Sequence, residues 1–98
     1  LSSSGLGTCA LLKTGAVDCW GNGADGQLGN GQFRDSAIPV SVVSTSGSGT
    51  LTGVASLVSG FGTCALLKTG AVDCWGFGKQ GQLGNGQFRD SAKPVPVW

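Results

Sequence analysis

The most chemically versatile side chains in this sequence belong to four cysteines, Cys9, Cys19, Cys64 and Cys74. Thiolates can bind zinc, and cysteines can also form disulfides or lie buried as free thiols. The spacing lacks the Cys-x2-Cys knuckle of structural zinc sites, and the chain has no histidine to complete a mixed site. The sequence therefore argues against zinc and leaves disulfides or buried thiols.

Few side chains in the sequence could act as a general acid or base. The chain has no histidine and no glutamate, and its five aspartates fall singly, with Asp18 and Asp73 inside predicted strands. Residues 26–31 are glycine-rich like a phosphate-binding loop, but they lack the Lys-Ser/Thr pair and no helix follows. Carboxylates are also too few for a calcium site. We therefore expect a non-enzymatic protein without catalytic residues, cofactor or metal.

Composition points to a turn-rich, all-β protein. Glycine supplies 19 of 98 residues, and because each interior glycine costs about 1 kcal/mol relative to alanine, long helices are disfavoured. A content of 40% apolar residues argues against a disordered tail. The net charge of +1 predicts neither nucleic acid nor an anionic membrane as a partner. Apolar runs are only a few residues long, far below the roughly 20 that span a bilayer.

A near-perfect internal repeat dominates the chain. Residues 7–21 recur unchanged as residues 62–76, an offset of 55, and only six of the 37 positions between 7–43 and 62–98 differ. Such near-identity indicates recent duplication or deliberate construction, so each unit must adopt much the same structure. We divide the chain into residues 1–55, the first repeat with its connector, and residues 56–98, the second repeat.

Each unit contains the pattern of a β-hairpin. Residues 8–13 and 16–20 are β-prone and flank a Thr-Gly turn. A three-residue loop places Cys9 opposite Cys19, and the second unit repeats this for Cys64 and Cys74. Opposed strand positions bring Cβ atoms within about 5 Å, which favours two disulfides within hairpins over buried free thiols. An oxidising or extracellular compartment follows if the disulfides form; otherwise the location is unassigned.

The remaining segments predict further strands and tight turns. Alternation gives the hairpin apolar residues on both faces, as expected for strands buried between stacked sheets. Leu28 is the only large apolar anchor in the glycine-rich turn that follows Trp20. Strands are expected from Pro39 and from Pro94 onward, with a flexible connector over residues 44–50. The first unit has serines where the second has Leu57 and Val58, so its leading strand is truncated.

These motifs resemble the regulator of chromosome condensation repeat. The resemblance rests on Thr-Cys-Ala-Leu, a turn glycine, Val-x-Cys-Trp-Gly, Gly-Gln-Leu-Gly-x-Gly and Pro-x-x-Val, and it covers nearly the whole chain. One departure is that members commonly carry a histidine where this chain has Gly7 and Gly62. The resemblance implies two four-stranded antiparallel β-propeller blades per chain, in a family whose propellers usually have seven. The resemblance also implies a platform for protein partners. The roles of such platforms in the family include guanine-nucleotide exchange, chromatin attachment and β-lactamase inhibition.

Two blades leave two open faces, which self-association into a ring would cover. We expect the chain to partner itself, as a homotrimer of six blades in preference to a tetramer of eight. The residues predicted to pack between blades are Trp20, Trp75, Leu28 and Leu83. A strand-exchange latch would bring Val95, Val97 and Trp98 of one copy near Leu1 of the next, although a frayed terminus is the alternative.

Two functions therefore stay open. The first is a structural, self-assembling propeller fragment, and the second is a protein-binding module. The Phe-Arg-Asp triplets at residues 33–35 and 88–90 are expected to form Arg-Asp surface ion pairs. In the functional alternative they form a polar ring on one face that meets a protein partner.

Overall fold

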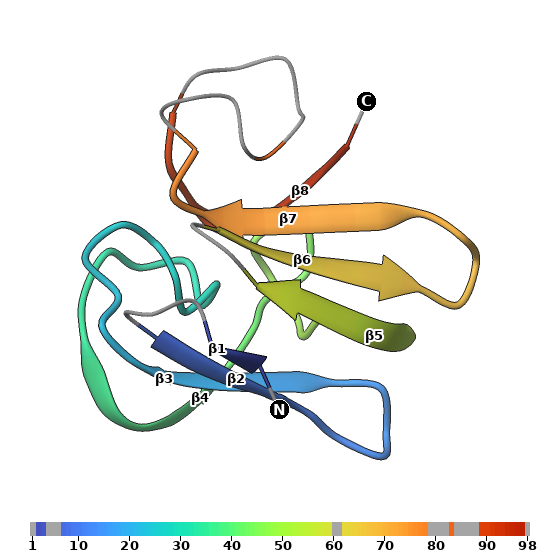
Figure 1. Cartoon of the computed structure of the whole chain (residues 1–98), viewed down its shortest axis with the longest axis horizontal. Coiled ribbons are helices and arrows are strands. Elements are labelled where there is room, and N and C mark those ends of the chain that lie inside the picture. The colour runs from blue at the N-terminus through green and yellow to red at the C-terminus, as the bar shows by residue number, and fades with distance from the viewer. Residues whose placement is uncertain (1, 4–6, 60–61, 79–82, 84–88, 98) are drawn as a thin grey trace.

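The computed structural model describes residues 2–3, 7–59, 62–78, 83 and 89–97. Within that part of the chain, strands form two four-stranded antiparallel sheets in sequence order (Figure 1). The first sheet consists of β1 (Ser2–Ser3), β2 (Gly7–Leu11), β3 (Val17–Gly21) and β4 (Ser36–Ser41). The second consists of β5 (Val54–Ser59), β6 (Gly62–Leu67), β7 (Val72–Gly76) and β8 (Ser91–Pro96). Each repeat thus builds one blade.

The β2–β3 hairpin has the predicted register. Cys9 pairs with Cys19, and the Leu12 N–H donates a 2.9 Å hydrogen bond to the Ala16 carbonyl, which leaves a three-residue loop. Gly15 adopts φ 90°, a left-handed conformation that favours glycine. The β6–β7 hairpin repeats this arrangement, so the local sequence is sufficient to specify the turn.

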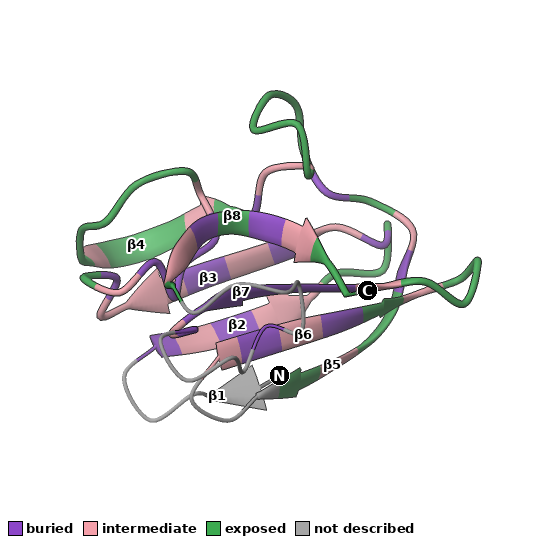
Figure 2. Ribbon diagram, turned by 90° about the horizontal axis from the view of Figure 1, so that it is seen from above, coloured by how far each residue is buried: buried purple, intermediate pink, exposed green. Residues whose placement is uncertain are grey.

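The two sheets are arranged radially. β1 and β5 are the first strands of their sheets and contact each other, while β4 and β8 end the sheets on the opposite side (Figure 2). β7 is largely buried, whereas β4 is mostly exposed (Figure 2). The two blades therefore fan out from their inner strands, as blades of a propeller do.

The outer strands begin earlier than predicted. β4 starts at Ser36, three residues before Pro39, because Ser36 pairs with Gly21 beyond a register shift that follows Cys19. Proline has no N–H to donate, and β4 tolerates Pro39 because it lies at the edge of its sheet. The prediction that the strand begins at proline was wrong because the bulge lengthens the pairing.

The connector is a hydrogen-bonded turn instead of a flexible segment. Val43 forms a bridge with Thr50, and the Leu51 N–H donates a 2.9 Å hydrogen bond to the Val42 carbonyl. β5 begins at Val54, so the second sheet starts two residues before the boundary drawn at position 56. Val42 and Leu51 are both buried, which ties the connector to the core.

The predicted alignment of the first unit's serines with Leu57 and Val58 is wrong by one residue. Ser2 pairs with Cys9, and Val58 pairs with Cys64. Ser2 is therefore the structural equivalent of Val58, so the inner strand of the first blade lacks that apolar side chain.

The hydrophobic core lies between the two sheets. Its members come from both blades and from the connector: Cys9, Val17, Cys19, Leu28, Val42, Leu51, Val54, Ala65 and Trp75. Each sheet on its own would expose these side chains. The interface between blades is consequently the main source of apolar burial in the chain.

Candidate functional site

Both predicted disulfides are present. Cys9 is bonded to Cys19 and Cys64 to Cys74, with a Cα–Cα distance of 4.0 Å in each pair. All four cysteines are therefore oxidised, and the alternative of buried free thiols was wrong. The direct opposition of the two cysteines in each hairpin register explains the pairing.

We call the interface between the two blades the seam. The front face of each sheet is the side that carries its disulfide, and the back face is the side that carries Trp20 or Trp75. In the seam, Cys9 and Val17 of the first front face pack with Ala65 and Trp75 of the second back face. The seam therefore joins unlike faces.

Trp75 anchors the seam through the glycine turn of the first blade. Its indole Nε1 donates a 3.0 Å hydrogen bond to the carbonyl oxygen of Gln27. A Cβ on Gly29 would lie 2.8 Å from the same Nε1, so only glycine fits this close approach. The Gly31 N–H donates a 2.8 Å hydrogen bond to the Ala92 carbonyl. Residues 26–31 thus dock onto β7 and β8 of the next blade.

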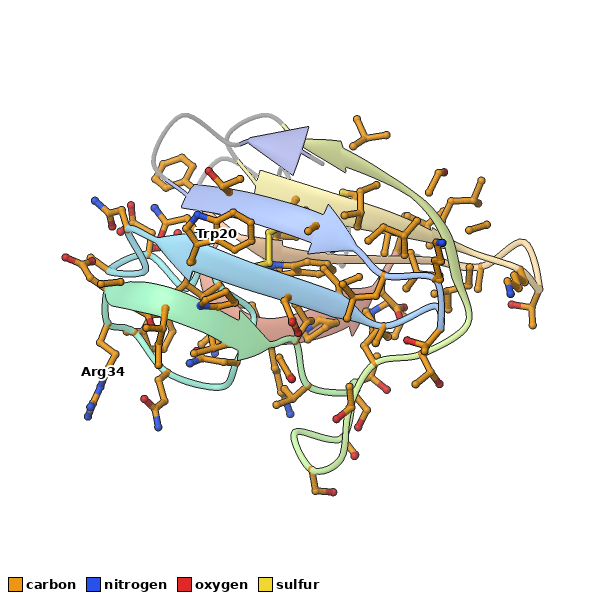
Figure 3. The ribbon with its side chains drawn as sticks, turned by 90° about the horizontal axis from the view of Figure 1, so that it is seen from below. Trp20 and Arg34 are labelled. Carbon is orange, nitrogen blue, oxygen red and sulfur yellow. A yellow bond between two sulfur atoms is a disulfide. The ribbon has the colours of Figure 1, made fainter. Side chains whose placement is uncertain are left out.

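The four residues predicted to pack between the blades take different positions. Trp75 and Leu28 lie in the core cluster of the seam. Leu83 is fully buried in its own blade, where it fills the space that a side chain at Gly62 would need. Trp20 is half-buried on the first back face, which points away from the second blade (Figure 3). Packing thus separates Trp20 from Trp75, although their local sequences are identical.

The first back face is uncovered. Ala10 and Trp20 are half-buried, and Ala37 and Pro39 are exposed. Their counterparts in the second repeat are all buried: Ala65, Trp75, Ala92 and Pro94. Because the side chains are the same, the difference in exposure measures what the first blade covers on the second.

The second front face is uncovered in the same way. Leu66 is 44% exposed and Val97 is 42% exposed, whereas Val42, the counterpart of Val97, is fully buried. Cys64 and Val72 are half-buried, whereas their counterparts Cys9 and Val17 are buried. The second front face therefore presents apolar side chains whose counterparts on the first front face are covered by the second blade.

The latch residues are only partly placed. Val95 pairs with Cys74 inside β8, the outer strand of its own sheet, so it is not free for strand exchange. Val97 donates a 3.0 Å backbone hydrogen bond to Val72 and keeps an exposed side chain. Leu1 and Trp98 lie outside the described residues. Of the four predicted residues, Val97 alone is described and available at the second front face.

The first Phe-Arg-Asp triplet, residues 33–35, lies in a loop with an exposed arginine, which we call the arginine loop. In the first blade, an Asp35 carboxylate oxygen accepts a 3.0 Å hydrogen bond from the Gly23 N–H. No ion pair with Arg34 is recorded in the described part of the chain, so the predicted pair is replaced by this clamp. Arg34 extends away from the ribbon (Figure 3), and Phe33 is 58% exposed.

The second arginine loop has the same clamp. An Asp90 carboxylate oxygen accepts a 3.0 Å hydrogen bond from the Gly78 N–H, and Arg89 is exposed. In both blades, a Cβ on the clamped glycine would collide with the carbonyl oxygen of the arginine. The repeat thus presents one arginine per blade in the same local geometry.

Burial at the seam also affects a carboxyl group. Asp73 is 5% exposed, and burial raises its pKa above the ordinary value of 3.8 because the charged form loses hydration. Its counterpart Asp18 is half-buried and accepts a 3.4 Å hydrogen bond from the Ser41 hydroxyl. The position of Ser41 is taken by Pro96 in the second repeat, which has no hydroxyl to donate.

The described residues contain no group of three or more His, Cys, Asp or Glu side chains that could hold a metal ion. Across the same residues, the structure has no helix of sufficient length and apolarity to span a bilayer.

Comparisons with known proteins identify similar repeats. The chain is 33% identical over 99 residues to the ultraviolet-B receptor UVR8 of Arabidopsis thaliana, covering 99% of this chain and 22% of that protein. It is also 33% identical to the mitochondrial RCC1 domain-containing protein RUG3 of the same plant, covering 99% and 21%. The chain therefore spans about a fifth of the length of these relatives.

Solved structures share the fold. Human WBSCR16 superposes with a TM-score of 0.79 at 28% identity, over 98% of this chain and 25% of that one. Yeast RCC1 (Prp20), solved with Kap60, superposes with a TM-score of 0.71 at 20% identity, over 99% and 24%. The Regulator of chromosome condensation (RCC1) repeat matches residues 14–66 and 69–97. With two β-propeller blades, a glycine turn docked on the next blade and this match, the chain belongs to the RCC1 repeat family.

Proposed function

We propose that the chain is a non-enzymatic protein-binding module built from two blades of an RCC1-type propeller. The observation that carries this proposal is the arginine loop, which each blade presents with the same Asp-to-glycine clamp. Arg34 is exposed without a recorded ion pair in the described part of the chain, and Phe33 is exposed beside it in sequence. Arginine and aromatic residues are enriched in protein interfaces and in their energetic hot spots.

The chemistry of the loop selects the partner. A guanidinium binds carboxylates through two parallel hydrogen bonds, so the expected partner is a protein surface rich in Asp or Glu. Arg89 repeats the same group in the second blade, which gives two contacts on one partner. Yeast RCC1 (Prp20) was solved bound to Kap60, and a second structure of that protein is described with its binding to Gsp1p and histones. These partners of a protein with the same fold support a binding role for this chain.

Affinity capture with matched charge variants tests the proposal. The immobilised chain is compared with Arg34→Glu/Arg89→Glu and with the control Lys13→Glu, which reverses a charge at an exposed hairpin tip. A protein captured by the wild type is purified and titrated. We expect the double variant to weaken its binding at least tenfold and the control to leave it unchanged. Equal binding by all three proteins contradicts a role for the arginine loops.

Self-assembly is a second candidate function, and the uncovered end faces favour it. The chain carries one uncovered back face and one uncovered front face. The seam inside the chain joins one face of each of these kinds. Two blades per chain permit a ring of six blades from three chains or of eight from four. Self-assembly and partner binding use different surfaces, so both can operate in one protein.

A further inference from the structure

We propose that the front face of the second blade binds the back face of the first blade in a second copy of this chain, head to tail. This inference rests on the self-assembly candidate above and adds the occupant, the polarity and the contact residues. It requires no new kind of interface, because the seam inside each chain already joins these two kinds of face.

Most strand residues of the seam are repeated at the free ends, whereas the core residues Leu51 and Val54 are not. On the back face, the seam uses Thr63, Ala65, Asp73, Trp75, Ala92 and Pro94, and the free end offers Thr8, Ala10, Asp18, Trp20, Ala37 and Pro39. On the front face, the seam uses Cys9, Leu11, Val17, Cys19 and Val42. The corresponding residues at the free end are Cys64, Leu66, Val72, Cys74 and Val97, of which only Cys74 is buried. None of the six positions that differ between the repeats belongs to these sets.

The seam also defines the polarity. A front face meets a back face within the chain, and two front faces or two back faces never meet. Repeating this contact between copies gives a heterologous interface, which closes into a ring or extends as a filament according to the rotation per copy. Because the two blades fan out from their inner strands β1 and β5, each added copy continues the rotation about the same side.

Trp20 has the contact chemistry that docking requires. Within the described part of the chain its indole N–H donates no recorded hydrogen bond, whereas the identical group of Trp75 donates to a backbone carbonyl of the neighbouring blade. The indole is half-buried on an otherwise uncovered face, so it retains apolar surface to lose on docking. A second copy would supply to Trp20 the kind of cover that the first blade supplies to Trp75.

Two single-face variants test the occupant and the polarity together. Ala37→Arg places a charged side chain on the free back face at an exposed position, and Leu66→Arg does so on the free front face. The matched control is Ala24→Arg, an exposed alanine in a turn outside the back- and front-face residue sets. Masses are measured by sedimentation, and near-UV circular dichroism verifies that each protein is folded.

The expected results are specific to a head-to-tail contact. The wild type and Ala24→Arg sediment at three or four times the 9.7 kDa chain mass, and Ala37→Arg and Leu66→Arg each sediment as a single chain. An equimolar mixture of Ala37→Arg and Leu66→Arg forms a dimer, because one free front face and one free back face survive. Ala10→Arg, a second back-face variant, replaces Ala37→Arg if that protein is not folded.

Three results would overturn the inference: a monomeric wild type, a single-face variant that still associates, or a mixture that stays monomeric. Association of Ala37→Arg alone would indicate contact between like faces. The outcome is independent of the arginine loops, because Arg34→Glu leaves both end faces intact and is expected to keep the wild-type mass. Loss of assembly with retained partner capture, or the reverse, therefore identifies which proposal fails.

Discussion

The indole Nε1 of Trp75 donates a 3.0 Å hydrogen bond to the carbonyl oxygen of Gln27, a residue 48 positions away in the other blade. Trp20 stands in the same local sequence and has no equivalent bond recorded among the described residues. The two tryptophans therefore differ in burial and hydrogen bonding because of the residues that pack against them, and not because of their local sequence. Identical side chains in the two repeats thereby serve as controls for one another.

Truncating the two tryptophans should have unequal effects. Trp75→Ala removes a fully buried side chain and is expected to lower the free energy of unfolding by about 3–5 kcal/mol. Trp20→Ala removes a half-buried one and is expected to cost no more than about half as much. Urea unfolding of each variant, at a concentration where the chain is monomeric, measures the difference. Equal losses would contradict the assignment of Trp75 to the seam.

The glycine turn offers a second matched comparison. Gly29 and Gly31 have φ of 64° and 85°, so alanine at either position incurs about 1–2 kcal/mol of backbone strain. A Cβ on Gly29 would also collide with Trp75, whereas a Cβ on Gly31 meets nothing within 4 Å. Gly29→Ala is therefore expected to destabilise the fold by clearly more than Gly31→Ala. Thermal unfolding of both variants measures the excess, and equal midpoints would show that the turn does not dock on Trp75.

Burial of Asp73 predicts a pH dependence of stability. Burial raises its pKa above 3.8, so the folded state binds the proton more tightly than the unfolded state does. The resulting stabilisation is fully present below the unfolded pKa and is lost as the pH rises through the raised folded pKa. At pH 7, Asp73→Asn is therefore expected to be more stable than the wild type, and this advantage shrinks as the pH falls toward 3.8. Urea unfolding at several pH values checks this, and equal stabilities of Asp73→Asn and the wild type at pH 7 would contradict it.

The disulfides are expected to differ in their rates of reduction. The Cys9–Cys19 bond is covered by the second blade, because both of its cysteines are buried. In the Cys64–Cys74 bond, Cys64 is half-buried on the uncovered front face. Native-state reduction with dithiothreitol should therefore open Cys64–Cys74 several times faster, because exchange requires access to a sulfur. Alkylation followed by peptide mass spectrometry identifies the opened pair, and equal rates would mean that the seam gives no protection.

Local features could be predicted from residues alone. The three-residue loop and the opposition of Cys9 to Cys19 follow from strand alternation and one turn glycine, both of which act over a few residues. Wrong predictions arose where distant backbone intervenes. Asp35 binds the Gly23 N–H twelve positions earlier instead of pairing with Arg34, and Ser36 joins its strand across a bulge before Pro39.

The sequence by itself determined the repeated unit, its hairpins and its similarity to propeller blades, and it favoured the two disulfides over free thiols. Each of these features depends on short-range geometry or on the identity of residues. Only the tertiary structure decided which copy of each residue is covered. Trp20 and Trp75 have the same neighbours in sequence, yet one lies on a free end face and the other in the seam. Burial depends on what packs against a side chain from elsewhere in the chain. Two identical repeats therefore differ in burial only after their blades stack and acquire different neighbours.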